Sequence, residues 1–69
     1  MQEIIEITTP FIRLCDFLKF AGICESGGRA KEAILDGEVF VNNEVCLLKG
    51  KKLYPNDVVK IEGQEYAVK

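Results

Sequence analysis

The chain has 69 residues, of which 48% are hydrophobic, and a formal net charge of -2. This length allows one small domain and no second core. The hydrophobic content argues against wholesale disorder, and no apolar run approaches the roughly 20 residues of a membrane span. The acidic N-terminus lacks the basic start of a signal peptide. We therefore expect a cytoplasmic protein.

The first predicted elements are a strand and a helix. Residues 2–7 are short and rich in isoleucine, which indicates a strand. An apolar stripe at helical spacing follows, and Gly22 ends the helix. The sequence does not decide whether this helix begins at Pro10 or nearer Leu14. The stripe consists of Leu14, Phe17, Leu18 and Ala21.

A second helix is predicted only about four residues later, so the two helices must turn sharply on each other. Ser26 is a favourable N-cap, and Gly37 provides a stop signal. The apolar stripe of this helix consists of Ala30, Ala33 and Ile34.

After Gly37 the pattern changes from helical to alternating. Residues 38–41 and 44–47 flank Asn42-Asn43 and predict a hairpin, because Asn tolerates the positive φ of such turns. An exposed loop is predicted over 49–52, and the last two strands over 58–61 and 65–68. The expected class is α+β, with two short helices packed on a small, mainly antiparallel sheet in the order β-α-α-β-β-β-β.

Catalysis and metal binding are not expected. The chain has no histidine, which removes the commonest general base and metal ligand. Cys15, Cys24 and Cys46 form no C-x-x-C pair and are odd in number, so we expect neither a disulfide framework nor a zinc site. We predict no cofactor and no small-molecule substrate.

The charges are segregated along the chain. Residues 26–31 and 49–52 together hold five basic residues and no acidic residue, whereas the rest of the chain carries -7. Binding to nucleic acid depends on such local patches rather than on the overall charge. Tyr54 is the only aromatic residue near them, so we do not expect a base-stacking platform.

The start of the second helix is a candidate anion site. Free backbone amides, the helix dipole and two unobstructive glycines favour a phosphate there, with Arg29 and Lys31 at the rim. The alternative is purely structural, a capped helix whose glycines allow a close approach to the first helix.

The sequence resembles the RNA-binding domain first defined in ribosomal protein S-four, also called the alpha-L motif. That family reads roughly as Arg-Leu-Asp-x-x-Leu, then Ser-Arg-x-x-Ala-Arg-x-x-Ile, then Gly-x-Val-x-Val-Asn-Gly, and later Gly-Asp before a strand. Arg13, Ser26 and Lys31 match positions of this pattern, whereas Gly27 replaces an arginine and Arg29 follows two residues later. The match covers residues 12–61 and is most similar to small stand-alone bacterial members.

The resemblance implies one RNA-binding domain over residues 1–69, with a core motif at 12–61. It implies a monomeric, non-catalytic protein that binds structured RNA, such as ribosomal or transfer RNA or a ribosomal particle. The expected contacts to the phosphate backbone are made by the N-terminus of the second helix and a basic loop. The alternatives are a DNA-binding module, which Glu32 and Asp36 on the second helix disfavour, and a protein-interaction module that uses a sheet edge. The residues expected to contact RNA are Arg13, Ser26, Gly27, Gly28, Arg29, Lys31, Lys49, Lys51 and Lys52.

Overall fold

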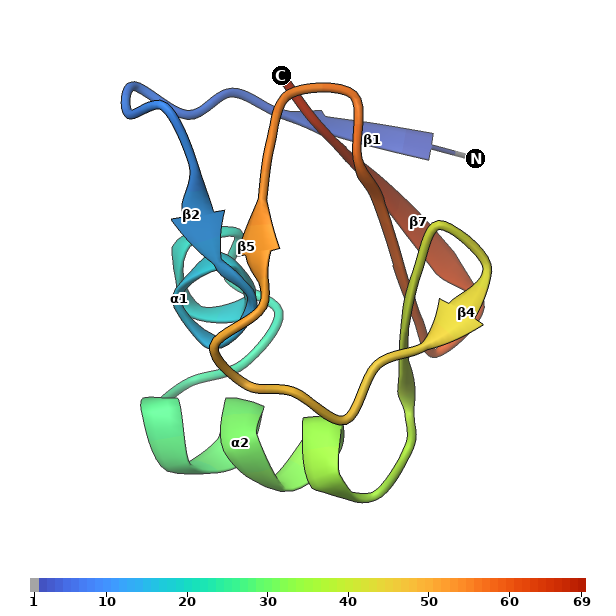
Figure 1. Cartoon of the computed structure of the whole chain (residues 1–69). Helices are drawn as coiled ribbons and strands as arrows, with labels where there is room; N and C mark the ends of the chain where they lie inside the picture. The colour runs from blue at the N-terminus through green and yellow to red at the C-terminus, as the bar shows by residue number, and fades with distance from the viewer. Residues whose placement is uncertain (1) are drawn as a thin grey trace.

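The computed structural model describes residues 2–69, and it confirms the α+β class, with two helices packed against a mainly antiparallel sheet (Figure 1). Two short strands are added to the expected order. The elements are β1 (Gln2–Ile5), β2 (Ile12–Arg13), α1 (Leu14–Phe20), α2 (Gly27–Leu35), β3 (Val39–Val41), β4 (Glu44–Val45), β5 (Lys52–Leu53), β6 (Val58–Ile61) and β7 (Gln64–Val68).

The main sheet has five strands in the order β1-β7-β6-β3-β4. All of its pairs are antiparallel except β1–β7, which joins the two ends of the described chain with Gln2 opposite Glu65. β1 is shorter than the strand expected over 2–7, but a backbone hydrogen bond from Ile7 to Lys69 continues the pairing beyond it. The last strand begins one residue earlier than expected.

A second, two-stranded sheet pairs β2 with β5 beside α1 (Figure 1). The prediction of an exposed loop over 49–52 is therefore wrong at its last residue, because Lys52 lies in β5 opposite Arg13. Leu53 anchors β5 to the rest of the domain, because its side chain is fully buried in the core.

The two helices supply one side of the core. α1 begins at Leu14 rather than at Pro10, because the two preceding residues, Ile12 and Arg13, are paired in β2. α2 is capped as predicted, since Ser26 Oγ accepts a hydrogen bond from the Arg29 amide at 3.3 Å. The buried cluster comprises Leu14, Phe17, Leu18, Ala30, Ala33, Ile34, Val39, Val41, Leu53, Val59, Ile61 and Val68.

The predicted turns also form. Gly22 and Gly37 follow the two helices with φ of 75° and 77°, a conformation that is easy only for glycine. The hairpin turns at Asn42 and Asn43, both at positive φ as expected. Its second strand is shorter than 44–47, because the chain leaves the sheet after Cys46 donates its amide to Val39.

Candidate nucleic-acid interface

The N-terminus of α2 exposes unused backbone donors. Within residues 2–69, the amides of Gly27 and Gly28 have no hydrogen-bond partner, as is usual for the first turn of a helix. A Cβ on Gly27 would lie 3.8 Å from the side chain of Lys19, so this α1 lysine reaches the start of α2. Lys19 was not predicted, because only the sharp turn between the helices brings it there.

Arg29 and Lys31 diverge, as residues two positions apart on a helix must. Arg29 Nη1 lies 3.8 Å from Glu32 Oε1, and both side chains are more than 60% exposed, so the ion pair is weak. Lys31 instead approaches Lys49 in the loop before β5. The two basic segments of the sequence therefore meet through Lys31 and Lys49, whereas Arg29 is turned towards its own helix.

The contact between Lys31 and Lys49 brings like charges together. The pKa of Lys49 is lowered from its usual value of 10.5, first because its neutral amine can accept a side-chain hydrogen bond from the Lys31 ammonium and then because two ammonium groups repel each other. A nearby anion would relieve this repulsion, because it favours the charged form of both groups.

The loop that carries Lys49 is fixed by backbone hydrogen bonds. The Lys51 carbonyl accepts from the Leu14 amide at 2.8 Å, and the Lys49 carbonyl accepts from the Cys15 amide at 3.1 Å. These carbonyls satisfy amides at the start of α1 that have no partner inside the helix. The loop thus caps α1, and its lysine side chains project from a fixed backbone.

A second pair of like charges lies on the small sheet, where Arg13 and Lys52 are direct cross-strand partners. Like charges placed opposite each other on two strands destabilise a sheet. We call Arg13, Lys31, Lys49 and Lys52 the basic face. Within residues 2–69, no carboxylate lies within 4.0 Å of any of these four cations. Lys51 lines a hollow together with Val45 and Leu48.

Aromatic residues accompany the basic face more closely than expected. The expectation that Tyr54 is the only aromatic residue near the basic segments is wrong, because the Phe11 ring lies 5.9 Å from it between centroids. Lys52 Nζ lies 4.9 Å from the centre of the Phe11 ring. The sequence contains a pattern that could have indicated this cluster, an aromatic and a basic residue two positions apart at 11 and 13 and again at 52 and 54. The pattern has a meaning only when β2 and β5 are known to pair.

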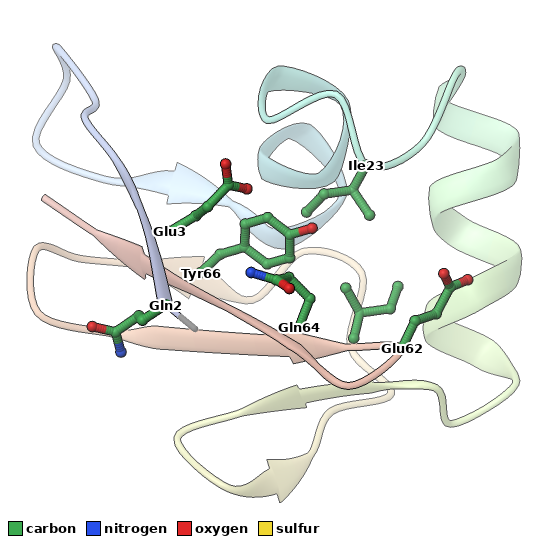
Figure 2. A pocket seen from close by; sticks show the side chains of 7 residues that line it. Gln2, Glu3, Ile23, Glu62, Gln64 and Tyr66 are labelled. Atoms are coloured by element: carbon green, nitrogen blue, oxygen red, sulfur yellow. The ribbon is translucent and has the colours of Figure 1, made fainter.

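A hollow of about 540 Å³ lies elsewhere, between the connection of the two helices and the edge formed by β1 and β7 (Figure 2). Tyr66 lines it together with Glu3 and Glu62, and the pKa of Tyr66 is raised by burial and by these two carboxylates. The negative charge of this hollow is unfavourable for phosphate, so the basic face is the better candidate for nucleic acid.

The cysteines behave as small apolar residues. Cys15, Cys24 and Cys46 are free, half-buried and packed against the core. Burial is the main cause of a raised pKa at Cys24, which keeps its thiol protonated. Among residues 2–69, no three His, Cys, Asp or Glu side chains form a group able to hold a metal ion. Over the same residues, no helix is long and apolar enough to cross a membrane.

Curated relatives cover nearly the whole chain. It is 48% identical over 63 residues to the probable ribosome maturation protein RlbA of Bacillus subtilis, covering 91% of this chain and 89% of that protein. It is 39% identical over 59 residues to the putative RNA-binding protein YbcJ of Escherichia coli, covering 86% and 84%.

Solved structures agree with the fold. The solution structure of E. coli YbcJ, whose alpha-L motif is described as involved in RNA binding, matches with a TM-score of 0.68 and 34% identity over 97% of this chain and 84% of that one. The 30S ribosomal protein S4e of Thermoplasma acidophilum shares the fold, with a TM-score of 0.66 and 20% identity over 87% of this chain and 32% of that one. The sequence model of the S4 domain, the S-four family named above, matches residues 5–69. The chain belongs to the S4 domain family.

Proposed function

We propose that this chain is a non-catalytic, monomeric RNA-binding protein of the cytoplasm that contacts the phosphate backbone of structured RNA. The observation that carries the proposal is the placement of like charges side by side in the basic face, Lys31 near Lys49 and Arg13 opposite Lys52 across the small sheet. Such like-charge neighbours destabilise the free protein and become favourable when an anion bridges them. Neighbouring phosphates of one RNA strand would supply several such anions.

Ribosomal RNA is the class of RNA that we propose, because the relative that is 48% identical is named a probable ribosome maturation protein. We further propose that residues 1–69 act as one S4 domain with its core motif at 12–61. The amides of Gly27 and Gly28 would add donors to the basic face, with Ser26 holding them in place. Arg29 and Lys51 would contribute less than the charge pattern of the sequence suggests, because Arg29 is paired with Glu32 and Lys51 lines a hollow with Val45 and Leu48.

Duplex DNA is a poorer ligand for this arrangement. Insertion of α2 into a major groove would place Glu32, which is 66% exposed beside Arg29, against the bases and phosphates. RNA in A-form is read instead through its shape and its backbone. Two pairs of cations with few base-reading side chains suit that mode.

The test is a titration of the protein with a labelled RNA hairpin, followed by fluorescence anisotropy at several salt concentrations. Replacing Lys31 and Lys49 together by Gln should weaken binding and lower the salt slope by about two, roughly one for each cation that no longer neutralises a phosphate. The matched control replaces Lys60 and Lys69, which lie outside the basic face, and should change little. Both pairs are exposed, so stability should change by no more than about 0.5 kcal/mol per site.

Equal losses of affinity from both pairs would show that binding follows bulk charge and would refute the basic face as the RNA site. The same hairpin sequence as duplex DNA should bind more weakly. Sequencing of RNA crosslinked to the protein in cells would identify the ligand, and a lack of enrichment of ribosomal RNA would contradict the proposed class.

A further inference from the structure

Two aromatic side chains share the outer side of the small sheet with the cations. Side chains alternate across a strand, so Phe11 and Arg13 lie on one side of the β2 segment and Lys52 and Tyr54 on the same side of the β5 segment. Leu53, between the last two, is fully buried on the opposite side. The outer side is therefore a mixed surface of two rings and two positive charges.

Core packing does not explain these rings. Neither Phe11 nor Tyr54 belongs to the buried cluster or to the apolar residues packed against it, and Tyr54 is 49% exposed. The rings lie 5.9 Å apart between centroids with their planes at 45°, and Lys52 Nζ lies 4.9 Å from the centre of the Phe11 ring. Phe11 is half-buried, and the part of this aromatic pair that stays exposed has an energetic cost in water unless a ligand covers it.

Hydrogen bonds fix the backbone at both aromatic residues before any ligand binds. The amide of Tyr54 donates to Asp57 Oδ2 at 2.8 Å. The carbonyl of Phe11 accepts a hydrogen bond from Thr9 Oγ1 at 2.7 Å. A binding surface that is already ordered loses less conformational entropy on binding.

There is also room next to Phe11. A hollow of about 400 Å³ lies between this segment and α1, and the residues that line it include the apolar Phe11 and Phe20 and the charged Arg13 and Asp16. Phe20 is 60% exposed. A planar, largely apolar ring such as a nucleobase fits such a space better than a phosphate does, whereas the neighbouring Arg13 and Lys52 suit phosphate.

We propose that the surface formed by Phe11 and Tyr54 receives an unpaired base of the bound RNA, while Arg13 and Lys52 hold the phosphates on either side of it. The inference rests on the proposed function and specifies its ligand as a structured RNA with an unpaired nucleotide beside a helical segment. A paired base has both faces covered by its neighbours in the helix, so only an unstacked base presents a face to an aromatic side chain.

The experiment compares two RNA hairpins that differ by one bulged nucleotide, with 2-aminopurine as the bulged base. The wild-type protein should bind the bulged hairpin more tightly, by about 5- to 100-fold, and should quench the 2-aminopurine fluorescence. Phe11→Leu and Tyr54→Leu should remove most of this preference and the quenching. Binding of the fully paired hairpin and its salt slope should stay nearly unchanged, because the phosphate contacts remain.

Phe40→Leu is the matched control, since Phe40 is a partly exposed phenylalanine on β3 of the main sheet, and this variant should retain the preference. Urea unfolding of every variant verifies that it is folded at the temperature of the titration. Equal affinity of the wild-type protein for the two hairpins, or equal losses for both hairpins in the two aromatic variants, would overturn the stacking proposal. In that case the basic face would remain the proposed phosphate site if replacement of Lys31 and Lys49 weakens binding. If the wild-type protein binds neither hairpin, both proposals are wrong.

Discussion

Replacing Asp57 by Ala should destabilise the domain more than its partly exposed position suggests. Its two carboxylate oxygens accept hydrogen bonds from the Tyr54 amide at 2.8 Å and from Asn42 Nδ2 at 3.1 Å. The same Asn42 accepts from the Val58 amide at 3.0 Å, so the hairpin turn and the turn before β6 depend on one carboxylate. Hydrogen bonds to a charged group contribute about 1.5–3 kcal/mol each. Because the site is half-exposed, we expect less than that, about 1–1.5 kcal/mol for each bond and a total of about 2–3 kcal/mol.

That loss is large for a domain of this size, whose total stability should be about 3–10 kcal/mol. It corresponds to a fall of about 10–20 °C in the melting midpoint, since 1 kcal/mol shifts a domain of 60–100 residues by about 4–8 °C. Asp57→Asn should lose less, because one acceptor oxygen remains. Asp36→Asn, at the end of α2, is the control and should change little. Thermal and urea unfolding give both quantities, and a loss below about 0.5 kcal/mol for Asp57→Ala would refute the role of Asp57 in joining the two turns.

Two further predictions concern α2 and the loop that it meets. Ser26→Ala should lower the free energy of unfolding by about 1 kcal/mol, because the cap on the Arg29 amide is removed, and an unchanged urea midpoint would mean that this hydrogen bond contributes nothing. Lys49→Gln should make the domain slightly more stable than wild type at neutral pH. The lowered pKa of Lys49 means that the fold disfavours its charged form, because of the hydrogen bond and the repulsion with Lys31, and glutamine carries no such charge. This gain in stability should disappear as the pH rises through the lowered pKa of Lys49 towards 10.5, because wild-type Lys49 then loses its charge. A gain in stability that stays constant into the alkaline range would show that the charge of Lys49 is not its cause.

Local signals in the sequence were sufficient for most of the fold. Ser26 and Gly37 marked the limits of α2, and Asn42-Asn43 marked the hairpin, because capping and positive φ restrict residue type at single positions. The β2–β5 sheet was missed, since a strand of two residues shows no periodicity and its partner lies forty positions away in the sequence. The start of α1 stayed undecided for the same reason, because only that pairing keeps Ile12 and Arg13 extended.

The candidate site was predictable in composition but not in arrangement. The sequence placed Lys31 and Lys49 in two basic segments, and the structure brings these two together. The structure does not bring Arg29 to Lys49, because the Arg29 side chain extends along its own helix towards Glu32, three residues later. Lys19 and Phe11 were missed because the sequence does not show how elements pack: Lys19 reaches the start of α2 through the turn between the two helices, and Phe11 reaches Tyr54 through the pairing of β2 with β5.

The parallel pairing of β1 with β7 has a consequence for how the domain folds. β1 has no other neighbour in the sheet, so it stays unpaired until the opposite end of the described chain has been made and has reached it. Contacts of such large sequence separation slow folding, because the entropy of closing the chain is lost before the contact forms. We therefore expect the helices and the β3–β4 hairpin to form early and β1 to join last. A nascent chain that lacks β7 would leave Ile5, which packs against the core in the complete domain, and the backbone of β1 available to chaperones or to other unpaired strands.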